Sequence, residues 1–274
     1  MRKNKSAFLS VPYILFMVIF TLVPLGVVAY YALTDPETGA FTLSNLGNLT
    51  MYLPSLGQSV LYAVISALIC LLLGYPVAYF IAHCGPVMQK MLYMLVMLPM
   101  CMSFLLRTLA WVGLLQDTGI INNLLEALGL ARVQLIRTPA AVILGMVYNY
   151  LPYMVLPLYA VIVKIDERLI EAAEDLGCTP VMTFVKVVLP LSLPGILSGI
   201  TMVFVPAVST FYISQKLGGP ETTVLVGDLI ERLFKQAANP NVGAALSLVL
   251  MALVFLCTGI MNRFGSDEEG GVVV

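Results

Sequence analysis

One stretch decides how this chain folds: residues Asp166 to Pro190, which read DERLIEAAEDLGCTPVMTFVKVVLP. It is a charged island between two long apolar runs. Asp166 is suited to cap a helix N-terminus, with Glu167 in the first turn beside the positive helix end. Gly177 lies where a C′ glycine would end that helix, and Thr179-Pro180 can begin another as N-cap and N1 proline. The stretch predicts two short helices joined by a glycine turn.

The first of these helices is expected to be amphipathic. Leu169, Ala172, Ala173 and Leu176 recur at the spacing of one apolar helical stripe, while three glutamates share another face. A unit this small cannot bury a core of its own, so it suits docking into a groove on another protein. An ordinary cytoplasmic loop that happens to be helical is the alternative.

The composition is that of a polytopic membrane protein. Of 274 residues, 60% are hydrophobic and only 11% charged, and the mean hydropathy is +0.96. Soluble domains carry about 25% charged residues. The net charge of −1 gives no reason to expect a nucleic-acid partner. We therefore predict an all-α membrane protein in contact with lipid.

Charged residues divide the sequence into six apolar runs long enough to be membrane spans. The loop at residues 164–190 connects the fourth span to the fifth. The predicted spans are residues 7–33, 55–82, 88–106, 140–163, 191–214 and 242–262. Pro24 should kink the first span, and Gly195 with Gly199 forms a small-xxx-small face that lets another helix approach closely.

The segments between the spans also carry expectations. Residues 34–54 predict a loop with room for a short surface helix, and residues 107–138 an interfacial helix-turn-helix with Trp111 at headgroup depth. Residues 215–240 should end in an amphipathic helix near 228–234, and the acidic tail from Arg263 should be disordered.

Six spans place both termini on one side of the membrane. Positive residues near the first span usually set orientation, and Arg2, Lys3 and Lys5 precede it with no lysine or arginine following it before Lys90. We expect both termini and the 164–190 loop to lie in the cytoplasm.

Several chemistries lack the residues that they need. The sequence contains no P-loop, no HExxH and no acidic pair within the predicted spans, so ATP binding by a P-loop, zinc hydrolysis and proton relay are poorly supported. The five cysteines are scattered and His83 stands alone, so neither a disulfide framework nor a metal site is expected. We predict no cofactor and no enzymatic activity. A membrane scaffold without transport activity remains an alternative.

A family resemblance begins at the central stretch. Glu171-Ala172-Ala173, three residues, Gly177, nine residues and Val187-x-Leu189-Pro190 resemble the EAA loop of ABC-importer permeases, with valine in place of the family's isoleucine. In that family the loop inserts into a cleft of the ATP-hydrolysing subunit. The resemblance implies that six residues couple this chain to an ATPase: Glu171, Ala172, Ala173, Gly177, Leu189 and Pro190.

The resemblance extends to polyamine-type permeases through further motifs, which occupy residues 73–80, 103–111, 151–159 and 189–196. It implies the type I ABC importer permease fold and import of spermidine or putrescine. The implied partners are a PotC-like permease in a heterodimer, two copies of a cytoplasmic ABC ATPase and an external polyamine-binding protein. Related permeases for iron, thiamine, phosphonates and opines share the framework, so another small solute is the alternative.

Aromatic residues near spans 4 and 5 are candidates for a substrate path. A polycation crossing a membrane without carboxylates could use cation–π contacts, each worth about 0.5–2 kcal/mol. The alternative is that these residues are core or interfacial-belt aromatics. The candidates are Tyr148, Tyr150, Tyr153, Phe211 and Tyr212.

Overall fold

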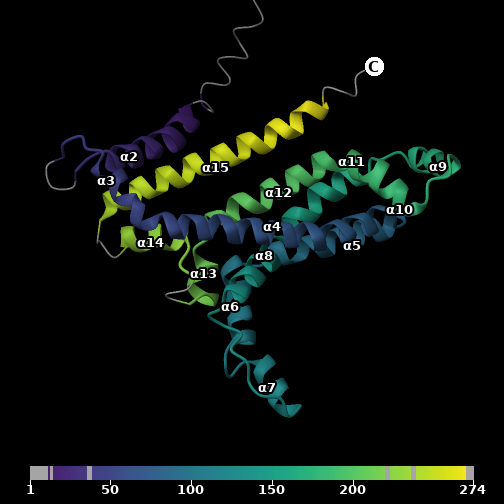
Figure 1. The fold of residues 1–274 in the computed structure, drawn as a ribbon, viewed down its shortest axis with the longest axis horizontal. Helices are drawn as coiled ribbons and strands as arrows, with labels where there is room; N and C mark the ends of the chain where they lie inside the picture. The colour runs from purple at the N-terminus through teal and green to yellow at the C-terminus, as the bar shows by residue number, and fades with distance from the viewer. Residues whose placement is uncertain (1–11, 13–14, 36–38, 220–222, 236–238, 270–274) are drawn as a thin grey trace, which may run out of the picture. The chain divides into compact units, whose positions relative to one another are not determined.

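A computed structural model of the chain describes residues 12, 15–35, 39–219, 223–235 and 239–269 (Figure 1). Within these residues the fold is helical, and the only β pairing is an isolated bridge between Thr34 and Phe41. The chain divides into two compact units, residues 1–54 with 229–253 and residues 55–228 with 254–274. Each unit is described by itself.

In the first unit, the carbonyl of Thr34 joins three segments. The Asn45 amide donates to the Thr34 oxygen at 2.9 Å and to the Ala32 oxygen at 3.2 Å, and the Asn241 amide donates to the Thr34 oxygen at 2.6 Å. The expected short helix in the loop is present. The elements of this unit are η1 (Val18–Leu22), α2 (Val23–Ala32), α3 (Ser44–Gly47), η2 (Asn48–Tyr52), most of α14 (Val226–Lys235) and the first part of α15 (Pro240–Glu269).

The first apolar helix is long enough to cross a membrane from Leu15 to Ala32. Residues 7–11 and 13–14 of the predicted span lie outside the described residues. Pro24 lies in the first turn of α2, directly after the π-helical turn η1, and the helical backbone is continuous from one into the other. The kink expected at Pro24 stays a prediction.

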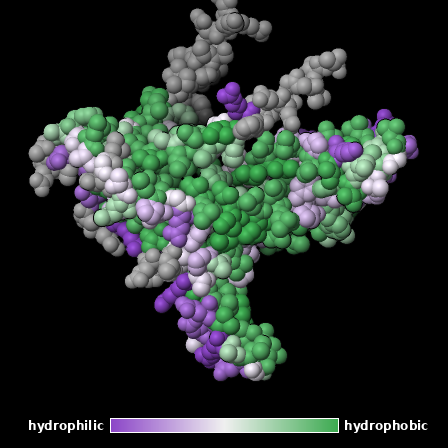
Figure 2. Space-filling view, viewed as in Figure 1, coloured by the Kyte–Doolittle hydropathy of each residue, from purple (hydrophilic) through white to green (hydrophobic). Residues whose placement is uncertain are grey.

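The second unit contains the remaining helices. They are α4 (Leu53–Ala82), α5 (Pro86–Met97), η3 (Leu98–Cys101), α6 (Phe104–Leu115), α7 (Ile120–Ala127), α8 (Pro139–Ile162), α9 (Glu167–Asp175), α10 (Pro180–Thr183), η4 (Phe184–Val188), α11 (Leu189–Leu191), α12 (Leu193–Val208) and α13 (Tyr212–Leu217). Figure 2 shows hydrophobic surface over α4, α5 and α8, whereas hydrophilic residues gather near α9 and on the α6–α7 lobe.

The core of this unit is the α8–α12 pair, which lies side by side in Figure 1. A Cβ added to Gly195 would lie 3.1 Å from the Pro157 carbonyl oxygen, and one added to Gly199 would lie 2.6 Å from the Met154 sulfur. The predicted close approach at this small-xxx-small face is confirmed. Absent side chains let the two backbones approach and gain dispersion contacts.

Within the described residues, five helices are long and apolar enough to cross a membrane, or six if a bent pair counts as one span. The second and fourth predicted spans correspond to α4 and α8, and α8 remains one helix through Pro152 and Pro157. The third predicted span, residues 88–106, is wrong. The helix breaks at Ser103, and the long apolar segment is Phe104–Ala127, in which Gln116–Gly119 separate α6 from α7. The prediction ended the span at Arg107 because it treated each charge as a boundary.

The fifth predicted span needs correction, whereas the sixth, residues 242–262, corresponds to the apolar segment Pro240–Met261. Helix α12 passes through Pro206 and ends at Val208 rather than near residue 214; the Ser209 N–H reaches the Val205 oxygen only at 3.4 Å, and Phe211 leaves the helical conformation with φ −130°. At the C-terminus, α15 continues to Glu269, so the tail expected to be disordered from Arg263 is helical that far.

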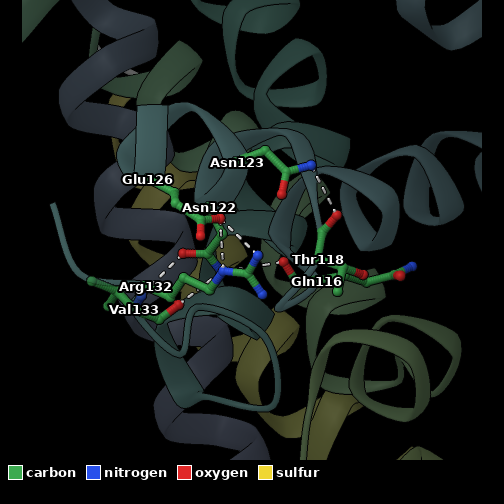
Figure 3. Close-up of polar contacts among 7 residues, drawn as sticks. All are labelled: Gln116, Thr118, Asn122, Asn123, Glu126, Arg132 and Val133. Carbon is green, nitrogen blue, oxygen red and sulfur yellow. Dashed lines mark hydrogen bonds and ion pairs between the residues drawn. The ribbon is translucent and has the colours of Figure 1, made fainter. Parts of the chain in front are cut away.

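The lobe formed by α6 and α7 is held by one buried amide (Figure 3). Asn122 is 1% exposed; its amide donates to the Gln116 and Val133 carbonyls, and its oxygen accepts from the Val133 N–H at 3.0 Å. The Arg132–Glu126 ion pair, 2.7 Å long, is half-exposed, so it stabilises the lobe little. The predicted helix-turn-helix is present.

Candidate functional site

Both ends of α9 are closed by side-chain and backbone hydrogen bonds. The Asp166 carboxylate accepts from the Arg168 N–H at 3.0 Å, which caps the N-terminus. At the C-terminus the Gly177 N–H donates to the Glu174 oxygen at 2.8 Å and the Cys178 N–H to the Ala173 oxygen at 3.0 Å, a Schellman motif. Gly177 has φ +83°, the left-handed conformation that this motif needs. The predicted helix and its glycine turn are confirmed.

The surface of this segment is open and partly apolar. Glu171, Ala172 and Gly177 are exposed, and Ala173 is half-buried. Leu176 is 86% exposed and Val181 is 73% exposed, which is more than nearly any other apolar side chain of the described residues. Exposed apolar residues clustered with charged ones are typical of an interaction surface. We call Glu171–Leu176 together with Val181 the α9 surface.

The second helix of the segment begins at Pro180 as predicted and ends at Leu191, next to Leu189-Pro190. The Thr179 hydroxyl accepts from the Met182 N–H at 3.4 Å, so the predicted N-cap is present. The helix then passes through the π-helical turn η4, continues to Leu191 and meets α12 at a 64° bend. Leu189 is half-buried and Pro190 exposed beside this bend. The segment is therefore continuous with a membrane helix, which sequence reasoning missed.

The buried side of this second helix contacts α4. The Phe184 ring lies edge-on to Tyr75 at 5.5 Å and to Tyr79 at 5.7 Å, measured between ring centroids. Val188 is also buried. Sequence reasoning did not single out these three aromatics, although Tyr75 and Tyr79 are spaced to share one helix face.

The candidate path aromatics do not form one cluster. Tyr150 is buried and its hydroxyl donates to the Pro206 oxygen at 3.3 Å, while its ring lies 6.3 Å from that of Tyr153. Tyr148 packs edge-on against Trp111, with centroids 5.4 Å apart. Phe211 is 42% exposed, and Lys216 Nζ lies 5.7 Å from the Tyr212 ring centroid. The arrangement brings Tyr150 and Tyr153 together and leaves the others on separate contacts.

A cation missed as a candidate lies close to these aromatics. Arg107 on α6 is 7% exposed, and its Nε and Nη1 atoms have no hydrogen-bond partner among the described residues. It lies within electrostatic reach of Tyr150, because α6 packs against α8. Its position at the end of an apolar run was misread as an interfacial boundary. Among the described residues, no group of three or more His, Cys, Asp or Glu could hold a metal ion.

The fold defines the class: a helical membrane protein with several apolar helices long enough to be spans. The family model of the binding-protein-dependent transport system inner membrane component matches residues 72–266, and the chain belongs to that family. It is similar to the spermidine/putrescine transport system permease protein PotB of Haemophilus influenzae, with 37% identity over 256 residues covering 90% of this chain and 89% of the relative. PotB of Escherichia coli is 37% identical over 220 residues, covering 79% of this chain and 80% of the relative.

Solved structures agree on the fold. A bacterial ABC transporter involved in the import of the acidic polysaccharide alginate superposes with a TM-score of 0.82 at 19% identity, covering 97% of this chain and 96% of the other. The MetNI methionine ABC transporter in an inward-facing conformation gives a TM-score of 0.62 at 18% identity, covering 80% of this chain and 97% of the other. The six-span ABC importer permease fold implied by the sequence is thus confirmed as a class.

Proposed function

We propose that this chain is a permease subunit that carries spermidine or putrescine into the cytoplasm, driven by ATP hydrolysis on a separate subunit. The observation that carries the substrate class is the 37% identity to PotB proteins over most of both chains. A PotC-like permease would complete the membrane path as a heterodimer. Two copies of a cytoplasmic ABC ATPase would supply energy, and an external polyamine-binding protein would deliver the substrate.

The α9 surface would be the ATPase docking site. Glu171 would bond at the ATPase surface, Ala172 and Ala173 would keep the contact flat, and Gly177 would make the turn. Leu189 and Pro190 would join the docked helices to α12. ATP binding would move these helices as rigid levers and open the permease toward the docked binding protein, by alternating access. The exposure of the α9 surface and its capped, rigid ends support this assignment.

A second candidate is an anionic solute such as a phosphonate. Arg107, buried with its Nε and Nη1 atoms unbonded among the described residues, and the Lys216 ammonium above Tyr212 place two cations beside the candidate path aromatics. Both would repel a polyamine and attract an anion. In the polyamine assignment, Tyr148, Tyr150, Tyr153, Phe211 and Tyr212 would hold the cation weakly enough to release it.

The polyamine and anionic-solute functions can be distinguished in a reconstituted complex. ATP hydrolysis would be measured in lipid nanodiscs with the external binding protein proposed above, supplied with spermidine, putrescine, ferric iron or a phosphonate. We expect stimulation by the polyamines alone. Stimulation by the phosphonate or iron instead would show that the substrate is that solute and not a polyamine. If no solute stimulates hydrolysis, or no ATPase co-purifies, a non-transporting scaffold is favoured.

Docking through the α9 surface makes its own prediction. Leu176→Asp should reduce ATPase co-purification about tenfold or more, because a charge would replace an apolar contact at the centre of the interface. Glu171→Lys should leave the protein inserted but uncouple ATP use from uptake. The matched control is Leu128→Asp, a 68% exposed leucine just after α7. Equal ATPase loss in the control would contradict a docking role for α9.

A further inference from the structure

The proposed ATPase docking leaves open how movement of a surface helix reaches the membrane spans. The covalent chain alone would transmit movement of α9 poorly, because a non-helical turn that includes Cys178 and Thr179 separates α9 from the next helix. A second route exists within the same unit. It runs from the helix that follows α9 to α4, through direct contacts between their side chains.

The route begins at an aromatic clasp, which we define as Tyr75, Tyr79 and Phe184. The two tyrosines lie one turn apart on α4, and the Phe184 ring presents its contacts to both at nearly right angles, 87° and 84°. Edge-to-face pairs at such distances resist sliding more than aliphatic contacts do, because the ring quadrupoles favour one geometry. A displacement of Phe184 would therefore carry α4 with it.

The clasp is tied to the 64° bend by one hydrogen bond. The Tyr75 and Ser192 hydroxyls are 2.8 Å apart, and Ser192 is fully buried at the residue where α11 meets α12. The Ser192 hydroxyl also donates to the Leu189 oxygen at 2.9 Å. Tyr75 thus touches both the docked helix and the hinge of the membrane helix that continues from it.

Two features favour transmission rather than packing alone. The helix that carries Phe184 is π-helical from Phe184 to Val188, and such turns are less regular and often lie at functional sites. The bend at Ser192 gives the two helices separate axes, so motion at one must be transferred to the other through contacts. The clasp and Ser192 are the contacts positioned to do so.

From this geometry we infer that Tyr75, Tyr79, Phe184 and Ser192 are positioning residues that transmit ATPase-driven movement of the docked helix to α4 and α12. The inference rests on the proposed function, since it needs an ATPase docked at the α9 surface. It assigns the two tyrosines of the Gly74–Tyr79 segment a role in coupling and not in substrate contact.

The test uses the whole importer in nanodiscs, with three readouts: ATPase co-purification, basal ATP hydrolysis and stimulation by the loaded binding protein. Phe184→Leu keeps apolar volume and loses the ring; Tyr75→Phe loses only the hydroxyl. Both should leave ATPase docking and basal hydrolysis within twofold of wild type. Stimulation should fall about threefold to thirtyfold, the range typical of changes in coupling between sites.

Two further variants separate coupling from folding. Phe184→Tyr retains an edge-on ring and should keep stimulation. Tyr93→Leu removes a comparable aromatic pair, the Tyr93–Tyr159 contact at 5.3 Å, which does not touch the docked helix, and it should also keep stimulation. In the double variant Tyr75→Phe/Ser192→Ala, stimulation should be no lower than in Ser192→Ala alone, because Ser192→Ala already removes the hydrogen bond to Tyr75 together with the one to the Leu189 oxygen.

The inference is overturned if Phe184→Leu and Tyr75→Phe retain stimulation within twofold, or if Tyr93→Leu loses as much. Should Phe184→Leu fail to assemble, Tyr75→Phe decides alone, since it deletes a single oxygen. A wild-type complex without any stimulation would instead refute the proposed function, so the two failures are distinguishable.

Discussion

At the residue scale, the role of Gly177 could be predicted from the sequence, whereas the burial of Arg107 could not. Gly177 occupies a left-handed conformation that glycine adopts at little cost, and a Cβ there would meet nothing within 4 Å. Its requirement is therefore set by the backbone alone. Arg107 carries a charged side chain, yet it is 7% exposed. Its burial follows from the helices that pack around it and not from the residues beside it in the sequence.

Replacement of Gly177 should therefore track backbone preference rather than side-chain size. Gly177→Val should destabilise the α9 turn by about 1–2 kcal/mol or more, whereas Gly177→Asn, which tolerates the left-handed region, should cost much less. The measurement is substrate uptake in membrane vesicles together with the quantity of inserted protein. Equal uptake by the two variants would show that the turn does not matter for coupling.

At the element scale, the α6–α7 lobe depends on the single buried side chain of Asn122. Asn122→Ala removes three hydrogen bonds that tie α7 to the Gln116 and Val133 backbone, at a cost of about 1–3 kcal/mol. Hydrogen exchange of amides 116–133 should accelerate while that of α8 stays unchanged. Asn122→Asp, which keeps the acceptor for the Val133 N–H, should show a smaller acceleration. Exchange that is unchanged in both variants would contradict the role of this amide.

The packing of α12 on α8 depends on the absence of a side chain at Gly195. Gly195→Ala places a methyl group 3.1 Å from a backbone carbonyl that cannot move aside, so it should lower the melting temperature of the purified protein. Gly57→Ala on α4 is the matched control, because a Cβ there meets nothing within 4 Å and alanine favours a helix by about 0.5–1 kcal/mol. A lower melting temperature for Gly57→Ala than for Gly195→Ala would argue against close packing at this face.

At the scale of the whole molecule, the proposed orientation places the α9 surface in the cytoplasm and the α6–α7 lobe outside. Cys178, a native and half-buried cysteine beside Gly177, reports one side. A Leu128→Cys substitution reports the other. With the remaining cysteines replaced, a membrane-impermeant maleimide should label Leu128→Cys in intact spheroplasts and Cys178 only after permeabilisation. Labelling of Cys178 in intact spheroplasts would reverse the topology and remove the ATPase docking site.

Much of the fold was predictable because membrane spans and helix caps are local properties. The ends of α4, α8 and α9 follow from runs of apolar residues, from the capping residue Asp166 and from Gly177. The predictions for residues 88–106 and 191–214 failed because charge was used as the boundary. Arg107 is buried within α6 and did not end a helix, whereas α12 ends at Val208, before any charged residue.

The sequence by itself determined where apolar helices lie, where α9 is capped, and which family the chain resembles, since each depends on neighbours in the chain. Only the tertiary structure decided that Phe184 contacts Tyr75 and Tyr79, that Ser192 is buried at the 64° bend and bonds Tyr75, and that Arg107 on α6 is buried near Tyr150. These facts join residues that are up to about a hundred positions apart. Such pairings depend on how helices pack, and packing of side chains leaves no periodic signal in the chain.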